Sequence, residues 1–255
     1  MTALPIQWIQ PDWPAPANVR AVSTLRTGGV SVGAFANLNL ATHVGDAAAA
    51  VAENRRRLQA ALDLDSAPLW LDQVHGVGVI AAGACASVVG NSADVPTADA
   101  SVCTGPGRAC VVLTADCLPV LFCDREGSRV GAAHAGWRGL AGGVLGATVA
   151  ALDVAPDQLL AWLGPAIEQS AFEVGAEVRD QFLARNAGAA AAFAVNDRGR
   201  WQADLYALAR LELASLGVQR VYGGTHRCFA DAARFFSYRR DGQTGRMATM
   251  IWLTR

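Results

Sequence analysis

The sequence predicts one α/β domain of stacked layers, and three observations lead to this prediction. The chain has 255 residues, which suits one large domain with a substantial buried core. Hydrophobic residues make up 52% and charged residues 17%, as is typical of a globular protein. Short apolar runs gather in the middle of the chain, with helix-like segments on either side, which favours a layered α/β arrangement.

The N-terminal quarter is expected to hold an arm, a strand and a helix. Residues 1–17 are rich in Pro and Trp and are predicted to be an irregular arm. Residues 19–25 have the pattern of a strand, and the following Arg-Thr-Gly-Gly is typical of a turn. Asp46 is expected to cap a helix that runs to about residue 63.

The middle of the chain is expected to be mostly strands, because its apolar runs are short and rich in Val. These runs cover residues 77–82, 98–103, 109–114, 118–123 and 129–133. The strands between residues 98 and 133 have no helices between them, so the pattern does not predict a doubly wound sheet. A helix of small residues over 139–152 and a strand over 159–163 are expected next.

The C-terminal third is expected to alternate between helices and strands. We predict helices over 174–186 and 201–216, and strands over 218–222, 234–239 and 247–253. The Ala-rich stretch 187–195 is expected to be a helix end or a loop without chemistry. Asp-Gly at 241–242 is typical of a turn between the last two strands.

Charge and composition exclude several functions. The net charge is −1, which argues against nucleic acid or an anionic membrane as the main partner. All 21 basic residues are Arg, so the chain cannot supply the Lys of a Schiff-base enzyme, a pyridoxal-phosphate enzyme or a Walker A loop. With no signal-peptide pattern, no membrane-span pattern and six Cys without C-x-x-C spacing, we expect a cytoplasmic protein, with a monomer favoured.

Three candidate metal ligands stand at the ends of apolar runs: His75, Cys117 and His134. Side chains at strand ends can converge from distant parts of a chain. Two imidazoles and a thiolate are a competent Zn²⁺ set that leaves the fourth position open for water or substrate. Asp116, beside the Cys, is a candidate for orienting a ligand or carrying a proton.

Spacing alone leaves other interpretations of these residues open, since 42 and 17 residues separate the three side chains. Cys117 can be a small buried hydrophobic residue, with each His a satisfied core residue. Alternatively, Cys117 and one His can form a nucleophile–base pair. The chain has only four His and three Met, which is too few to build the blue and trinuclear centres of a multicopper oxidase together.

Several other polar residues are candidates for substrate contacts. Asn39 and His43 can face a substrate, or can belong to the entry of the helix that follows them. Arg26 and Arg138 lie beside Gly-rich turns, where a guanidinium can hold a phosphate or carboxylate or simply lie on the surface. The G-x-S-x-G at residues 29–33 lacks a following helical pattern and is interpreted as a turn, not a serine-hydrolase elbow.

Seven segments, taken in order, resemble one known family, the bacterial YfiH proteins, long labelled polyphenol oxidase or laccase-like. The segments are STLRTGGVS at 23–31, LNLATHVGD at 38–46, QVHG at 73–76, ADCLPV at 115–120, AHAGWRG at 133–139, GPAI at 164–167 and FFSYRRDGQTGR at 235–246. The resemblance runs from about residue 20 to the C-terminus. The segment 225–230, with His226 and Cys228, departs from the family pattern, so we expect one wall of the pocket to differ from that of the family.

The resemblance implies an α/β/β/α layered sandwich, related to the catalytic domains of cytotoxic necrotizing factors. It implies Zn²⁺ held by His75, Cys117 and His134. Copper, where it is found, is expected to be an adventitious metal. The resemblance also implies phosphorolysis of adenosine, inosine and methylthioadenosine, together with deamination of adenosine. The alternatives are a hydrolase that edits an amide bond of peptidoglycan precursors at the same site and, less favoured, a copper phenol oxidase.

On this basis the expected partners are a nucleoside and phosphate, and roles can be given to specific residues. Cys117, Asp116 and His43 are expected to be catalytic, with Asp116 or His43 handling protons. Arg26 is expected to clamp the anionic substrate. Asn39, Gln73 and Arg138 are expected to complete the substrate site.

Overall fold

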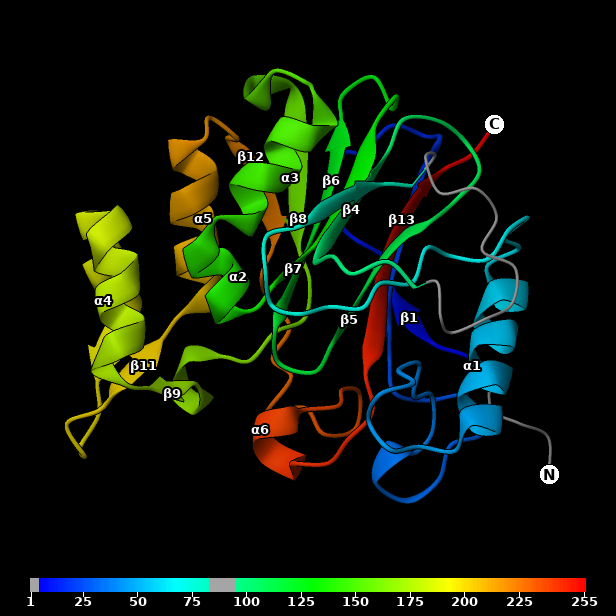
Figure 1. Ribbon diagram of the computed structural model, residues 1–255, viewed down its shortest axis with the longest axis horizontal. Helices are drawn as coiled ribbons and strands as arrows, with labels where there is room; N and C mark the ends of the chain where they lie inside the picture. Colours follow the sequence, from blue (N-terminus) through cyan, green and yellow to red (C-terminus); the bar gives the residue numbers. More distant parts are fainter. Residues whose placement is uncertain (1–4, 83–94) are drawn as a thin grey trace.

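The structure, a computed structural model, describes residues 5–82 and 95–255 and consists of four layers (Figure 1). Helix α1 (Ala48–Ala61) covers the outer face of a four-stranded sheet. That sheet packs on a six-stranded sheet, whose other face is covered by the remaining large helices. The predicted α/β/β/α sandwich is thereby confirmed.

The four-stranded sheet joins the two ends of the chain to its middle. It has the order β1 (Trp8–Ile9), β2 (Val19–Thr24), β13 (Met247–Leu253), β5 (Cys110–Thr114), and all neighbours are antiparallel. Strand β13 lies at its centre, since Ile251 pairs with Ala21 on one side and with Cys110 on the other. A C-terminal strand therefore completes the sheet that the N-terminal region begins.

The six-stranded sheet is mixed. Its order is β12 (Arg220–Gly223), β8 (Leu159–Leu163), β6 (Leu118–Asp124), β7 (Val130–Ala135), β4 (Ala100–Cys103), β3 (Val79–Ala81). The two edge strands run parallel to their neighbours, and the inner pairs are antiparallel. The antiparallel pairing of β7 with β4 and β6 agrees with the absence of crossover helices between residues 98 and 133.

Both faces of the six-stranded sheet are buried, which explains why its strands are continuous apolar runs. Along β6, Leu118, Val120 and Phe122 pack against the helices, whereas Leu121 and Cys123 pack between the sheets. Alternate side chains of β6 therefore belong to two different cores, one beneath the helices and one between the sheets.

The helices on this second sheet include α2 (Trp137–Gly142), α3 (Val144–Leu152), α4 (Ala176–Arg185) and α5 (Leu205–Ser215). A small sheet of β9 (Glu173–Val174), β11 (Trp201–Ala203) and β10 (Phe193–Val195) lies near α4 in Figure 1. Short 3₁₀ turns cover Gly33–Phe35, Pro156–Gln158, Gln169–Ala171 and Ala187–Ala192. The last short helix, α6 (Tyr238–Asp241), lies at the bottom of Figure 1.

Most predicted elements are present, and the exceptions have local causes. The predicted helix over 139–152 is two helices, because Gly143 takes the left-handed conformation with φ of 99°. The predicted helix over 201–216 begins with strand β11. The predicted arm over 1–17 contains the short strand β1, and the Ala-rich stretch 187–195 ends in strand β10.

Three further predictions were wrong. Residues 234–239 do not form a strand, because Phe235 and Phe236 fill a small core and Ser237 then caps α6 through its side chain. The expected hairpin turn at 241–242 is therefore the end of α6. Asp46 does not cap α1, since the N-cap is Ala47 and the Asp46 carboxylate accepts hydrogen bonds from Ser31 and Asn39 as well as from the Ala47 N–H.

Asn54 of α1 is a buried polar link between this helix and the loop before it. Its Oδ1 accepts from the Val30 N–H at 2.8 Å, and its Nδ2 donates to Ser31 Oγ and the Asn39 carbonyl, each at 2.8 Å. Asn54→Leu is expected to lower the free energy of unfolding by about 2–4 kcal/mol, because these partners lose their hydrogen bonds without regaining water. Denaturant unfolding measures this, with Arg56→Leu on the exposed face of α1 as the control; equal effects of the two changes would contradict the assignment.

Among the described residues, no helix combines the length and the apolar character needed to cross a bilayer.

Candidate metal centre

The three predicted metal ligands meet at one end of the space between the two sheets. His134 lies near the end of β7 and Cys117 directly precedes β6, and the register of these strands pairs His134 with Pro119. His134 and Cys117 have the same parity as Ala132 and Leu121, which face the other sheet. His75 comes from a loop before β3 and has a left-handed backbone with φ of 60°.

The geometry of the triad suits a metal ion. The ligand atoms of His75, Cys117 and His134 all lie within 4.8 Å of one another, and Cys117 Sγ lies 3.9 Å from His75 Nε2. The two imidazole rings are edge to face, with centroids 4.8 Å apart. Among residues 5–82 and 95–255 this is the one such group of three or more His, Cys, Asp or Glu side chains. It could therefore hold a metal ion with one position left for substrate.

Asp99 fixes both histidines of the triad from behind. Its fully buried carboxylate contacts His134 Nδ1 at 2.8 Å, which directs Nε2 of that ring toward the site. The same carboxylate accepts hydrogen bonds from the backbone N–H groups of His75 (2.9 Å) and Gly76 (2.6 Å). One side chain thus orients one ligand and holds the strained loop that carries another.

In the metal-free triad the charge of Cys117 is coupled to the proton of His134. Burial alone would raise the pKa of the Cys117 thiol, but the charge and hydrogen bonding of His134, with help from His75, lower it to about 6. Burial alone would lower the pKa of His134, but Cys117 and Asp99 raise it to about 9. The pair thus favours a Cys117 thiolate, the form that binds metals, beside a protonated His134, and a bound metal ion would replace the His134 proton.

The triad fits beside Gly136 because this residue has no side chain. A Cβ at this position would lie 2.8 Å from Cys117 Sγ and 3.1 Å from His75 Cδ2, although the backbone angles of Gly136 suit any residue. Gly136→Ala is therefore expected to displace both ligands and weaken metal affinity by roughly tenfold or more. Competition with a coloured chelator measures the affinity; Gly105→Ala, whose added methyl meets open space, is the control, and unchanged affinity in Gly136→Ala would be the contrary result.

Asp116 lies beside Cys117 in an unusual conformation, with φ of 91° and only 8% of its surface exposed. Its Oδ2 accepts from the Arg239 N–H at 2.6 Å, whereas Oδ1 is buried without a hydrogen-bond partner in the described part of the chain. Burial raises the pKa of Asp116, against the lowering effect of the Arg239 N–H. Through this hydrogen bond the Asp116 carboxylate links α6 to the turn that carries Cys117 and precedes β6.

Two of the predicted substrate residues, Arg26 and Asn39, make their contacts with other parts of the protein. The Arg26 guanidinium donates to the carbonyls of Ala36 and Ala232 and stacks on Phe236, with Cζ 4.5 Å from the ring centroid. Asn39 is fully buried, and its Oδ1 accepts from the Arg246 N–H at 3.0 Å. These contacts tie loops together, and a role toward substrate stays a prediction for both residues.

The other three predicted substrate or catalytic residues differ in their surroundings: one is bonded to the backbone of β5, and two are exposed. Gln73 bridges the loop to β5, donating to the Leu113 carbonyl (2.9 Å) and accepting from its N–H (2.7 Å). His43 is largely exposed, and the partial burial of its ring, followed by the charge of Arg246, lowers its pKa. Arg138 is exposed and stacks on Trp137, with Cζ 4.4 Å from the ring centroid. Their roles toward substrate stay predictions.

Two residues of the site, Asp99 and Arg246, have no individual role in the predictions made from the sequence. Arg246 Nη1 donates to the carbonyls of Thr244 and Gly245, and the charges of Cys117 and Asp116 raise its pKa against the larger lowering by burial. Asp99 interrupts an apolar run at the start of β4, which is the signal that could have identified it. Arg246 has no comparable signal, because its place depends on how the C-terminal loop folds.

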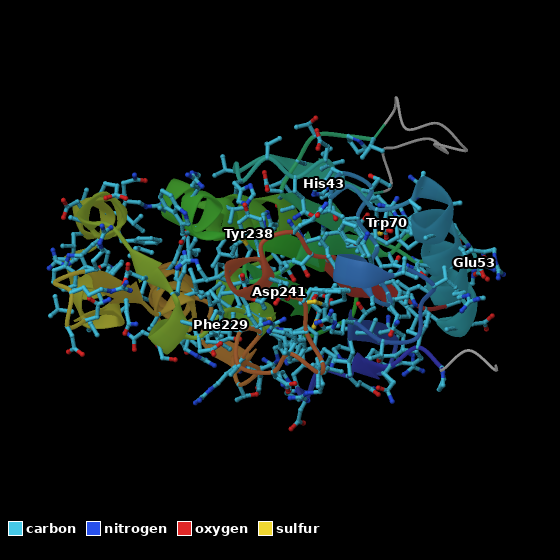
Figure 2. All side chains as sticks on the ribbon, turned by 90° about the horizontal axis from the view of Figure 1, so that it is seen from below. His43, Glu53, Trp70, Phe229, Tyr238 and Asp241 are labelled. Carbon is cyan, nitrogen blue, oxygen red and sulfur yellow. The ribbon has the colours of Figure 1, made fainter. Side chains whose placement is uncertain are left out.

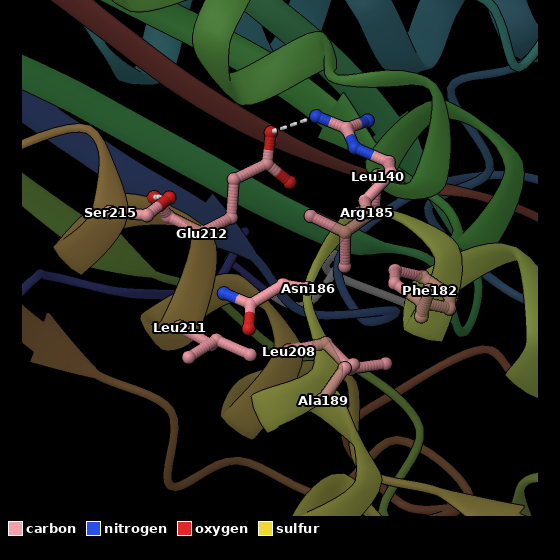
Figure 3. Close-up of a pocket in the computed structure, with 9 residues that line it drawn as sticks. All are labelled: Leu140, Phe182, Arg185, Asn186, Ala189, Leu208, Leu211, Glu212 and Ser215. Carbon is pink, nitrogen blue, oxygen red and sulfur yellow. Dashed lines mark hydrogen bonds and ion pairs between the residues drawn. The ribbon is translucent and has the colours of Figure 1, made fainter.

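Two cavities lie outside the triad itself. One, of about 610 Å³, is lined by His43 and Trp70, which Figure 2 labels near α1, and by Arg55 and Asp72. The other, of about 150 Å³, lies between α2, α4 and α5 (Figure 3), where Arg185 and Glu212 form an ion pair at 3.6 Å. Neither cavity has a triad residue in its lining, but the larger one is lined by His43, on whose ring the charge of His75 acts.

The fold and the site together define a class of α/β/β/α-layered protein with a His–Cys–His group at one end of its two sheets. A family model described as "Multi-copper polyphenol oxidoreductase laccase" matches residues 20–254. The chain belongs to this laccase-like family, which includes the YfiH proteins.

Named relatives agree in sequence over almost the whole chain. Purine nucleoside phosphorylase PA4543 of Pseudomonas aeruginosa is 56% identical over 247 residues, which cover 96% of this chain and 98% of that protein. Purine nucleoside phosphorylase YfiH of Escherichia coli K12 is 51% identical over 245 residues, with 96% and 98% covered.

Solved structures agree in fold. Protein NMB0706 of Neisseria meningitidis superposes with a TM-score of 0.91 at 52% identity, covering 97% of this chain and 99% of that one. YlmD of Geobacillus stearothermophilus superposes with a TM-score of 0.89 at 32% identity, covering 97% and 96%.

Proposed function

We propose that the chain is a zinc-dependent purine nucleoside phosphorylase that uses the His75–Cys117–His134 site. The observation that carries the proposal is this triad, whose three ligand atoms lie within 4.8 Å of one another and would leave the fourth position of a tetrahedral site to water or substrate. Relatives that are 56% and 51% identical bear the name of this activity. The substrates we propose are inosine, adenosine and methylthioadenosine, and we propose deamination of adenosine as a second activity.

The residues present fit the ion. Two imidazoles and one thiolate are a set that Zn²⁺ prefers, and the carboxylate of Asp99 supports His134 as expected behind a zinc ligand. When bound, Zn²⁺ would supply Lewis acidity toward an oxygen of the substrate. Copper in this site would be an adventitious metal, and the four His of the chain are too few for a multicopper oxidase.

In the proposed phosphorolysis a phosphate oxygen forms a bond to C1′ of the ribose while the C1′–N9 bond breaks. The base leaves with the electron pair of that bond and gains a proton, giving base and ribose 1-phosphate. A guanidinium is suited to hold the attacking phosphate, and Arg26 and Arg246 are the candidates. Asp116 and His43 are the candidates for proton transfer.

Product analysis tests the proposal. The zinc-loaded protein is incubated with inosine or adenosine, with and without phosphate, and the products are separated by chromatography. Hypoxanthine and adenine that form only with phosphate support phosphorolysis, and inosine formed from adenosine supports deamination. If neither the free bases nor inosine appear at full zinc occupancy, the nucleoside proposal fails. The hypothesis to test is then a hydrolase of peptidoglycan-precursor amide bonds.

A further inference from the structure

The segment 164–167, which follows β8, holds the turn of Cys117 from both sides. The N–H of its first residue donates to the Pro119 carbonyl at 2.9 Å, and the N–H of its last residue donates to the Asp116 carbonyl at 3.0 Å. Cys117 lies between these two carbonyls in the chain. Asp116 has a φ of 91°, a conformation that a residue with a side chain keeps when its surroundings hold it there. The position of this segment therefore bears directly on the position of a metal ligand.

The side chain of Tyr206 fixes this segment through its hydroxyl group, from α5, which lies beside β12 in Figure 1. The hydroxyl oxygen accepts from the Ala166 N–H at 2.9 Å. Its one proton has two carbonyl acceptors within reach, that of His226 at 2.6 Å and that of Gly164 at 3.0 Å. A phenylalanine would fill the same space, so it is the hydroxyl that ties these backbone groups to α5.

The same hydroxyl joins the segment to the loop 225–230. In addition to the bond from Tyr206 to the loop, the Cys228 N–H donates to the Ala166 carbonyl at 2.9 Å, and Ala166 and Arg227 form a parallel bridge. Burial raises the pKa of the Tyr206 hydroxyl, so it keeps its proton at neutral pH. Loss of this hydroxyl would therefore free two neighbouring stretches of backbone from α5 at once.

Tyr206 does not reach the site directly. It belongs to the lining of neither cavity, and in the described part of the chain its hydrogen bonds all go to backbone groups outside the triad. Its connection to Cys117 runs through the backbone of the segment 164–167 alone.

We propose that Tyr206 is a positioning residue of the metal centre, whose hydroxyl fixes the segment 164–167 and thereby the turn that carries Cys117. This inference rests on the metal site of the proposed function. Metal ligands must be held to within roughly 0.5 Å of the productive geometry by the groups around them. Because Tyr206 acts through intervening backbone, loss of its hydroxyl should loosen the site without abolishing it.

The test compares Tyr206→Phe with the wild type, each checked for folding by circular dichroism and loaded with Zn²⁺ or Co²⁺. Release of metal to a chelator is expected to be about tenfold faster in the variant, the lower end of the effect of groups that support a metal ligand. The thiolate-to-metal absorption of the Co²⁺ protein should shift while the metal content stays near that of the wild type. For phosphorolysis, kcat should fall with KM little changed, since Tyr206 lines no cavity.

Arg210→Met is the matched control. Arg210 lies one turn beyond Tyr206 on α5, and its guanidinium donates to the carbonyls of Val221 (3.0 Å) and Gly223 (2.8 Å) in β12. It therefore also ties α5 to the sheet, but at a strand that does not carry the turn of Cys117. We expect this variant to lose stability and to release metal at the wild-type rate.

Alkylation of Cys117 by iodoacetamide in the metal-free protein separates this inference from the proposed function, because it needs neither metal nor nucleoside. Mass analysis of the peptide that carries Cys117 gives the rate. Tyr206→Phe is expected to react about threefold faster or more, since the turn opens more often.

Unchanged release and alkylation rates in folded Tyr206→Phe, or equal effects in Arg210→Met, would overturn the positioning role. A wild type that binds metal but shows no phosphorolysis overturns the proposed function alone, and the release and alkylation rates then decide the role of Tyr206. If the wild type binds no metal, the zinc-dependent function and the metal-positioning role fall together.

Discussion

Cys117→Ala is expected to reduce the bound metal of the purified protein from near one ion per chain to near zero. The substitution removes the only anionic ligand of the triad and leaves two imidazoles, which hold Zn²⁺ far more weakly than a three-ligand set. Metal analysis after dialysis measures the loss. In Co²⁺-substituted protein, the thiolate-to-metal absorption should disappear as well, and phosphorolysis should fall by at least about a hundredfold.

Cys103→Ala provides the matched control. Cys103 is also a buried thiol, at the end of β4, and its Sγ donates to the Gly105 carbonyl at 3.1 Å, apart from the metal group. We expect this variant to lose some stability and keep its metal. If Cys117→Ala retained a full equivalent of tightly bound metal, Cys117 would not be a ligand, and a Cys–His nucleophile pair would be the better account of the site.

The sequence predicts the layers well where burial alone decides the structure. Strand β8 matches the predicted residues 159–163, because an apolar run of this length fits a strand buried on both faces. The same reasoning fails at 234–239. Phe235 and Phe236 are buried there in a small core of their own, and the polar Ser237 starts a helix instead of continuing a strand.

The candidate site was predictable only in part. Cys117 and His134 stand at the ends of apolar runs, and the pairing of β6 with β7 brings them together, as the position of the runs indicates. His75 depends on a loop with positive φ, which no local pattern predicts. Its place is set by Asp99, which lies 24 residues away in the chain.

The environment of Arg55 could not be predicted from the sequence. In the sequence it is one of three consecutive Arg residues at 55–57 on a predicted helix, and nothing local distinguishes it from its neighbours. In the structure Arg56 and Arg57 pair with Glu53 near the surface, while Arg55 stacks on Trp70 in the cavity. The direction in which each side chain leaves the helix separates the three, and only the packing of α1 on its sheet defines that direction.

Asp99→Asn is expected to weaken metal affinity by about 10–100-fold, the usual effect of losing the support behind a histidine ligand. An amide keeps the size of the carboxylate but offers one acceptor oxygen. With that oxygen on His134 and the His75 N–H, the amide nitrogen must face the N–H groups of Gly76 and Val74, which are themselves donors. Both the His134 ring and the loop of His75 therefore lose their fixed geometry.

Asp124→Asn is the control that separates this effect from a general loss of stability. Asp124 is also a buried carboxylate with several bonds, accepting from the N–H and Oγ of Ser128 and from the Arg129 N–H in the turn between β6 and β7. Each substitution is expected to cost about 2–3 kcal/mol in unfolding of the metal-free protein, since each leaves buried donors unpaired. Only Asp99→Asn should also speed the release of metal to a chelator. Equal release rates in the two variants would mean that Asp99 stabilises the fold but does not position the metal ligands. The geometry of the triad would then be set by the strands and Gly136.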